Sequence, residues 1–343
     1  MADIALRTGL SRSGTRGQRR DDREESVVTV IDPIELVAPD IAPYRHGNTD
    51  IEHVSSITAD EPGPHVLVNA LMHGNELCGA VALDFLFRHG IRPRRGRLTL
   101  SFCNVAAYAT FDPRAPVASR YVDEDMNRVW SPVVLDGPRD SVELRRARQL
   151  RPLFESADFL LDLHSMQNPT APLMLCGRTA RAERLARAVG FPAWIVADAG
   201  HAAGRRLIDH GRFADPDGHA VALLAECGQH WRRDTGPVAV ETTLRFLLAT
   251  GCIDRADAAP WLPGGPRPEP CLVEVTEAVT VGSDAFTFSE PYLGMEIIPA
   301  AGTVIASDGG RPVRTPYDDC ILIMPSRRLS RGQTAVRLGR LRP

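Results

Sequence analysis

The sequence predicts an α/β protein: a sheet covered by helices on both faces, followed by a small all-β domain. Three observations predict this architecture. Short apolar runs alternate with helix-patterned segments between residues 65 and 250, which is typical of a sheet with buried strands. A Pro/Gly-rich stretch at 255–270 interrupts the alternation, and short strand-like segments follow it. The length of 343 residues is enough for one large domain or two.

Apolar runs and helical spacing locate the individual elements. The expected strands are 65–71, 97–105, 158–163, 172–176, 193–197 and 220–225. The expected helices are 76–88, 141–156, 179–189 and 236–250. Residues 106–140 hold too many Pro, Asp and Arg residues for a regular core element, and such a segment in a compact domain is usually functional or disordered. Toward the C-terminus, CLVEVTEAVTV, GTVIAS and CILIMP are expected strands.

These patterns divide the chain into four parts: a tail at 1–25, a catalytic α/β domain at 26–255, a linker at 256–270 and a C-terminal β domain at 271–343. The tail is Arg-rich and then acidic, with little apolar surface to bury, so it is expected to be disordered. A nucleic-acid-binding arm is the alternative, but the tail lacks aromatic residues and ends in acidic ones.

Composition excludes several classes of function. All 40 basic residues are Arg, so a Schiff-base lysine and a Walker A phosphate loop are absent. The formal net charge of -3 gives no basic field for nucleic acid or anionic membranes. No apolar run approaches the roughly 18–20 residues that span a bilayer, and no secretory signal is evident. The seven scattered Cys residues form no C-x-x-C pair and are expected to be reduced thiols in the cytoplasm.

The first chemical cluster, His73 and Glu76, stands where an apolar strand turns into a helix. The intervening Gly74 permits a tight turn, so the imidazole and the carboxylate are able to converge on one ion. By itself the pair is a weak signal, because a surface His beside a first-turn Glu is common.

The second cluster, Asp162 and His164, ends the apolar run DFLLDL. A His at this position is more often structural than a ligand, but here it supplies the second imidazole that the first cluster lacks. Two His and one carboxylate leave a tetrahedral zinc with one open position for water. Asp162 either orients His164 or is an ordinary strand-end carboxylate satisfied by backbone N–H groups.

Glu226 follows the strand at 220–225 and is a candidate general base, with an ordinary turn residue as the alternative. The irregular segment adds Arg120, suited to an oxyanion, and Arg128, suited to a substrate carboxylate. A solvated charged loop is the alternative interpretation of that segment.

In this order, His73-x-x-Glu76, Arg120, Asn127-Arg128, His164 and Glu226 resemble the succinylglutamate desuccinylase/aspartoacylase family. The likeness extends over roughly residues 60–340 and includes the β-rich end of the chain. It implies a zinc-carboxypeptidase-like mixed sheet flanked by helices.

Carried over residue by residue, the resemblance implies one zinc ion at His73, Glu76 and His164. Glu226 is then the general base and acid, Arg120 polarises the scissile carbonyl, and Asn127 with Arg128 binds a substrate carboxylate. A further substrate-binding Arg has no clear match here. The candidates for that residue are Arg205, Arg206 and Arg212, of which we choose Arg212. Tyr317 is expected either to reach the site from the C-terminal part or to lie on the surface.

The sequence therefore predicts a zinc-dependent deacylase of small N-acyl amino acids or similar carboxylate-bearing amides. The paired imidazoles favour zinc over magnesium, whereas cobalt, manganese and iron stay open. Two alternatives stand: a metallocarboxypeptidase acting on peptides, and a non-catalytic protein stabilised by a metal. No nucleic-acid or membrane partner is expected, and a homo-oligomer stays open.

Overall fold

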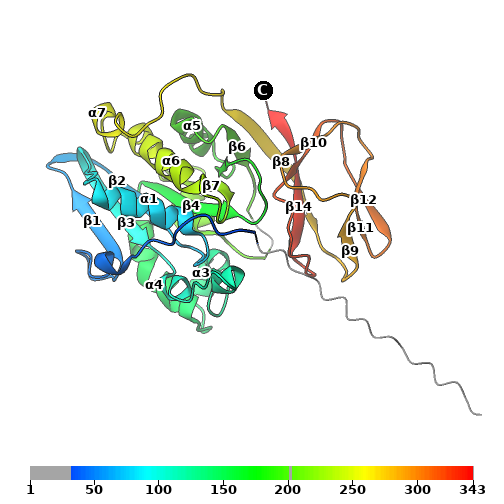
Figure 1. The fold of residues 1–343 in the computed structure, drawn as a ribbon, viewed down its shortest axis with the longest axis horizontal. Coiled ribbons are helices and arrows are strands. Elements are labelled where there is room, and N and C mark those ends of the chain that lie inside the picture. The colour runs from blue at the N-terminus through cyan, green and yellow to red at the C-terminus, as the bar shows by residue number, and fades with distance from the viewer. Residues whose placement is uncertain (1–31, 201–202, 343) are drawn as a thin grey trace, which may run out of the picture. The chain divides into compact units, whose positions relative to one another are not determined.

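The structure, a computed structural model, describes residues 32–200 and 203–342 (Figure 1). The predicted tail at 1–25 lies outside these residues. From Pro33 onward the chain forms one compact unit. The helices are α1 (Leu77–Arg88), α2 (Val105–Tyr108), α3 (Pro132–Leu135), α4 (Val142–Glu155), α5 (Ala180–Val189), α6 (Thr235–Ala249) and α7 (Arg255–Ala258). Single 3₁₀ turns are η1 (Ala42–Tyr44), η2 (Pro116–Arg120), η3 (Met126–Arg128), η4 (Leu207–Asp209) and η5 (Gly211–Phe213).

The strands of the α/β part are β1 (Val54–Thr58), β2 (Glu61–Ala70), β3 (Arg95–Phe102), β4 (Phe159–Met166), β5 (Leu173–Leu175), β6 (Trp194–Ala197) and β7 (Val221–Gln229). Those of the C-terminal part are β8 (Cys271–Thr280), β9 (Phe286–Phe288), β10 (Glu296–Ile298), β11 (Val304–Asp308), β12 (Arg311–Arg314), β13 (Cys320–Ile323) and β14 (Thr334–Arg342).

Within the described residues, one mixed sheet of 11 strands organises the fold, in the order β1-β3-β2-β4-β7-β5-β6-β8-β14-β13-β10. Figure 1 shows α1, α5 and α6 on one face of its α/β part and α3 and α4 on the other. Residues of β2 alternate between the two hydrophobic cores. Val66 and Val68 lie in the core beneath α1, α5 and α6, and Leu67 lies in the core on the side of α4. Burial on both faces explains why these strands read as continuous apolar runs.

The C-terminal strands continue this sheet. Strand β8 pairs in parallel with β6, and β14, β13 and β10 follow as antiparallel neighbours. Only β9, β11 and β12 form a separate small antiparallel sheet. The predicted fold class is confirmed, with the added finding that most C-terminal strands are hydrogen-bonded into the large sheet.

The three central strands β2, β4 and β7 run parallel to one another. Their register places Asn69 beside Asp162 and His164 beside Glu226. The carboxyl ends of neighbouring parallel strands lie at one edge of a sheet, where ligands bind in folds of this type. The sheet therefore collects the three polar clusters at that edge.

Two further observations concern the whole described chain. None of its helices is long and apolar enough to cross a membrane. All seven cysteines are unpaired thiols, and only Cys271 is exposed. The cytoplasmic location expected from the cysteines stays a prediction.

His65, which lies on β2 well before the strand's carboxyl end, predicts a pH dependence of stability. Its ring nitrogens face Ser156 O at 3.0 Å and Thr99 Oγ1 at 2.9 Å. Burial, reinforced by the charge of Arg97, lowers the pKa of His65 to about 4. The unfolded chain binds a proton near pH 6.5 and the folded one does not, so stability is full above pH 6.5 and falls between about pH 6.5 and 4.

We expect this single group to remove about 2 kcal/mol of the free energy of unfolding over that interval. Urea denaturation at pH 7.5 and pH 4.5 measures the loss, and His65→Gln should reduce it by the same amount. An unchanged pH dependence in the variant would show that His65 titrates normally in the folded protein.

Candidate metal centre and active site

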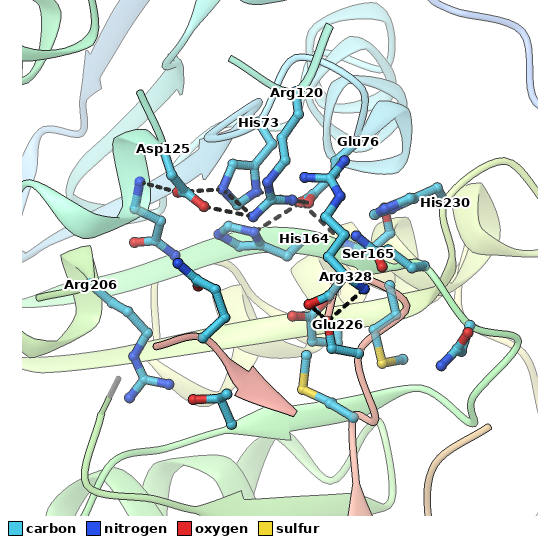
Figure 2. A pocket seen from close by; sticks show the side chains of 18 of the residues that line it. His73, Glu76, Arg120, Asp125, His164, Ser165, Arg206, Glu226, His230 and Arg328 are labelled. Atoms are coloured by element: carbon cyan, nitrogen blue, oxygen red, sulfur yellow. Dashed lines mark hydrogen bonds and ion pairs between the residues drawn. The ribbon is translucent and has the colours of Figure 1, made fainter. Parts of the chain in front are cut away.

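Two imidazoles and one carboxylate converge at the carboxyl ends of β2 and β4. His73 and Glu76 stand in the turn between β2 and α1, and His164 is near the end of β4. One ligand atom from each lies within 4.8 Å of the others, and all three residues are buried (Figure 2). The prediction that these three residues meet is confirmed.

The orientation of the two rings suits a divalent ion. His73 Nδ1 is 2.8 Å from Glu76 Oε1, and His164 Nδ1 is 2.9 Å from Glu76 Oε2. The opposite nitrogens face other carboxylates: His73 Nε2 lies 2.9 Å from Asp125 Oδ1 and also 2.9 Å from Arg120 Nη2, and His164 Nε2 lies 2.9 Å from Asp162 Oδ2. Carboxylates behind the imidazoles fix the tautomer that leaves Nδ1 as the metal ligand. The donor set fits a three-ligand metal centre.

Electrostatic attraction between Glu76 and the two imidazoles stabilises the triad. Burial alone would raise the pKa of Glu76, but the two imidazoles outweigh burial and keep it well below its usual range. Burial opposes protonation of His164, whereas Asp162 and Glu76 raise its pKa well above the usual range. Binding of a metal ion must displace these protons, so acid should weaken binding.

Gly74 makes the sharp turn possible by close approach. A Cβ at Gly74 would lie 2.4 Å from both Ala107 C and Ser119 O. Its N–H donates to Arg120 O at 3.1 Å, which ties the turn to the segment that carries Arg120. The tight turn predicted at Gly74 therefore requires glycine, because any side chain would collide with the neighbouring backbone.

The irregular segment at 106–140 is ordered by one buried carboxylate. Glu143 on α4 accepts backbone N–H bonds from Val122 at 2.7 Å, Asp123 at 3.0 Å and Glu124 at 3.2 Å. This fixes the chain just before Asp125, which caps η3 by accepting the N–H of Asn127 at 2.9 Å. The segment is therefore a set of anchored turns rather than a solvated loop.

Arg120 lies against the triad. Its Nη1 is 3.2 Å from Glu76 Oε1 and its Nη2 is 2.9 Å from Asp125 Oδ2. Asn127 and Arg128 line the same pocket. The Asn127 Oδ1 accepts the N–H of Leu207 at 2.9 Å, and Arg128 Nη1 donates to Asn127 O at 2.9 Å.

Glu226 on β7 faces this pocket from the strand next to His164 (Figure 2). Its Oε2 has no hydrogen-bond partner among the described residues. Burial raises the pKa of Glu226 to about 8, partly opposed by His164. The group is thus a buried carboxyl able to change its protonation state near neutral pH.

The structure places two predicted substrate-binding residues outside this pocket. Arg212, on η5, is half-exposed and donates to Glu155 O at 3.1 Å. The hydroxyl of Tyr317 contacts Thr276 Oγ1 at 2.5 Å, and its ring stacks under Arg340. These contacts of Arg212 and Tyr317 are made at the protein surface, away from the pocket. We therefore do not include either residue in the proposed site.

Of the other two candidates, Arg205 is exposed and outside the pocket, whereas Arg206 lines it. Arg206 is buried between Asp198, at 2.6 Å and 2.9 Å, and Asp209, at 2.7 Å. Its guanidinium is therefore already neutralised by two carboxylates.

Among the pocket residues that received no role in the sequence interpretation, four are ionisable side chains with a bearing on the site: Asp125, His230, Arg328 and Arg337. His230 Nδ1 lies 2.9 Å from Ser165 Oγ, and burial lowers the pKa of His230 to about 3. Arg337 had a signal in the sequence, since a charged residue interrupts the apolar run of β14. Arg328 had none, because arginines occur throughout this chain.

Asp125 predicts a measurable effect on metal affinity. Asp125→Asn should weaken metal binding about 10–100-fold, because it replaces the carboxylate that faces the His73 ring with a neutral amide, a weaker acceptor whose NH₂ group competes for the same position. Titration against a chelator of known affinity measures the change. Glu124→Gln, which removes a neighbouring carboxylate paired with Arg139 instead, is the control. Equal affinity in both variants would mean that Asp125 does not orient the ligand.

The profile described as the succinylglutamate desuccinylase/aspartoacylase catalytic domain matches residues 62–246. Comparison with the sequences of curated proteins finds no match.

Solved structures share the fold at low sequence identity. Succinylglutamate desuccinylase from Vibrio cholerae is 18% identical with a TM-score of 0.62, and 84% of this chain and 86% of that one are covered. The ectoine utilization protein EutE (DoeB) from Ruegeria pomeroyi, solved with product bound, is 19% identical with a TM-score of 0.59, covering 83% and 88%. Murine aminoacylase 3 is 20% identical with a TM-score of 0.55, covering 83% and 97%.

The matched region contains the three converging ligands, Arg120, Asn127, Arg128 and Glu226. It spans more than half of the chain, and the likeness in fold extends beyond it into the C-terminal strands. The chain therefore belongs to the succinylglutamate desuccinylase/aspartoacylase family of metal-dependent deacylases.

Proposed function

We propose that the protein is a zinc-dependent deacylase that hydrolyses the amide bond of a small N-acyl amino acid or a related carboxylate-bearing amide. One observation carries the proposal: the His73–Glu76–His164 triad shares its pocket with Glu226, whose Oε2 is unpartnered among the described residues. A purely structural metal site gains nothing from such a group, since an unpaired buried polar atom costs about 1–3 kcal/mol. Family membership supports the same activity.

His73, Glu76 and His164 would hold the metal ion. Two imidazoles favour zinc over magnesium, which prefers oxygen ligands. When bound, the ion supplies Lewis-acid chemistry that polarises the carbonyl and lowers the pKa of water.

Glu226 would move the proton. As a carboxylate it accepts a proton from the attacking water, and as a carboxylic acid it returns that proton to the leaving amine nitrogen. Burial favours its neutral form, whereas a divalent cation in the same pocket favours the carboxylate. These opposing influences suit a group that must both take and give a proton.

Arg120 would stabilise the oxyanion that develops on the attacked carbonyl. Its guanidinium is held beside the triad by Glu76 and Asp125, so it is oriented before substrate binds. Asn127 and Arg128 would bind the substrate carboxylate, because the Arg128 fork has no carboxylate within ion-pair distance among the described residues.

A small substrate fits the walls of the pocket. Eight residues of the C-terminal part line the cavity of about 440 Å³ together with the catalytic strands: Met324, Pro325, Ser326, Arg328, Ser330, Gln333, Thr334 and Arg337. A long peptide would have to pass these loops. The metallocarboxypeptidase alternative uses the same metal ligands, so only substrate tests separate the two.

Purified protein loaded with zinc is expected to bind about one ion per chain and to release free amino acid from N-acyl amino acids. A panel of N-acetyl and N-succinyl amino acids and unblocked tripeptides tests this. Cleavage of tripeptides alone would replace the proposal with a carboxypeptidase. A loaded protein inert toward the whole panel would favour the non-catalytic alternative.

A further inference from the structure

Strand β7 carries a bulge immediately after Glu226. Its pairing with β4 is regular as far as His164 and Glu226, but the next pair is Met166 with Gln229. Two steps along β4 therefore match three steps along β7, so β7 holds one extra residue at this point. Gly228 accommodates the insertion with a φ of 111°, a conformation that other residues rarely adopt. A bulge bends its strand and changes the direction of neighbouring side chains.

The direction of Glu226 depends on this stretch of backbone. Its Oε2 is buried and has no hydrogen-bond partner among the described residues. A side chain that hydrogen bonds do not orient is oriented by its backbone and by the packing around it. The contacts that fix the shape of the bulge therefore also fix where the Glu226 carboxyl group lies in the pocket.

Ser165 and His230 join the two strands just beyond the bulge. Ser165 Oγ lies 2.9 Å from His230 Nδ1, and the N–H of His230 donates to Met166 O at 2.8 Å. Both side chains are buried and line the pocket (Figure 2). Because a hydroxyl group both donates and accepts, the contact is satisfied in either tautomer of the neutral imidazole. Ser165 directly follows the ligand His164, so this hydrogen bond links the strand of a metal ligand to the strand of Glu226.

The same region is fixed to the turn that carries the other two ligands. Trp231 Nε1 donates to Asn75 O at 3.1 Å, within the turn between His73 and Glu76. The N–H of Ser165 donates to Glu76 Oε2 at 3.3 Å. The chain just after the bulge is therefore tied to both elements that supply ligands, which sets the position of β7 relative to the metal centre.

We propose that Ser165 and His230 are positioning residues: their hydrogen bond closes the bulge in β7 and holds Glu226 in the place that proton transfer at the metal centre requires. This inference rests on the proposed deacylase function, which assigns the proton transfer to Glu226. Neither side chain needs to contact the substrate for this role. Loss of the hydrogen bond should let the bulge relax, and a displacement of the carboxyl group by about 1 Å is enough to slow a reaction about 100-fold.

Two substitutions of His230 separate hydrogen bonding from packing. His230→Phe keeps a ring but removes Nδ1, whereas His230→Asn keeps a polar group able to hydrogen-bond with Ser165. In the zinc-loaded, full-length protein we expect His230→Phe to lower kcat about 10- to 100-fold with little change in KM. His230→Asn should recover most of that loss.

Ser165→Ala removes the hydroxyl group but keeps the backbone N–H that donates to Glu76. It should lower kcat as much as His230→Phe does. Because the two side chains act through one hydrogen bond, the double variant should be no slower than either single variant. Zinc content should stay at the wild-type level in all of these proteins, since none of the three ligands is changed.

His65→Phe is the matched control. It also removes a buried imidazole that lies against a serine, with Nδ1 3.2 Å from Ser156 Oγ, but His65 is outside the pocket. This variant should lose stability and keep its kcat. Crystal structures of the same proteins give a measurement independent of turnover: the Glu226 carboxyl group should be displaced in His230→Phe and unmoved in His65→Phe.

Three results would overturn the inference while the deacylase proposal stands. They are a wild-type kcat in either His230→Phe or Ser165→Ala, equal losses in His230→Phe and His230→Asn, and an unmoved Glu226 carboxyl group in a slow His230→Phe enzyme. If the zinc-loaded wild type hydrolyses no N-acyl amino acid, the proposed function fails and this inference fails with it.

Discussion

Glu226→Gln is expected to lower kcat by about 10³-fold or more while metal binding and fold are retained. Glutamine has nearly the same size and fits the same place on β7, but its amide does not accept a proton from water. Glu226 is not one of the three converging ligands, so the ion should stay bound. The neutral carboxyl group favoured by burial is already similar to an amide, which limits the cost to stability.

Steady-state kinetics with zinc analysis of the same sample measures this effect. Glu241→Gln is the matched control, because it also removes a buried carboxylate but one that pairs with Arg245 on α6, outside the pocket. It should lose stability and keep its turnover. A Glu226→Gln protein with near-normal turnover would remove Glu226 from the mechanism.

His73→Ala is expected to reduce bound metal from about one ion per chain to a small fraction of that, with loss of activity. The two remaining ligands, Glu76 and His164, hold a divalent ion far more weakly than three ligands do. The substitution also leaves Asp125 without its imidazole partner. Atomic emission or absorption analysis after dialysis gives the stoichiometry.

His65→Gln serves as the control, since His65 is also buried on β2 but outside the pocket. This variant should keep its metal. Equal metal content in His73→Ala and wild type would contradict the ligand assignment and, with it, the interpretation of Arg120 and Asp125.

The central strands were predictable because burial on both faces of a parallel sheet leaves uninterrupted apolar runs. The expected strand 158–163 and helix 141–156 correspond to β4 at Phe159–Met166 and α4 at Val142–Glu155. Strands such as β9, β10 and β12 have only three or four residues, too few to show a pattern. The pairing of β6 with β8 joins segments far apart along the chain, and nothing local in either sequence specifies it.

The triad was predictable for a related reason. Each ligand follows an apolar strand, and parallel neighbours bring those ends to one edge of the sheet. The role of Asp125 depends instead on how Glu143 and the turns around η3 fold the irregular segment. Arg328 reaches the pocket through sheet continuity and loop anchoring, so sequence reasoning had no means to separate it from surface arginines such as Arg212.

The central claim is that two Nδ1 atoms and one carboxylate hold a single ion in the pocket that Glu226 faces. Anomalous X-ray diffraction at the zinc edge, from crystals of the zinc-loaded protein, tests it most directly. The account predicts one strong peak at about 2.0–2.2 Å from Nδ1 of His73, Nδ1 of His164 and a carboxylate oxygen of Glu76. A crystal with this pocket well ordered and its zinc bound elsewhere, or coordinated through Nε2 of either histidine, would contradict it.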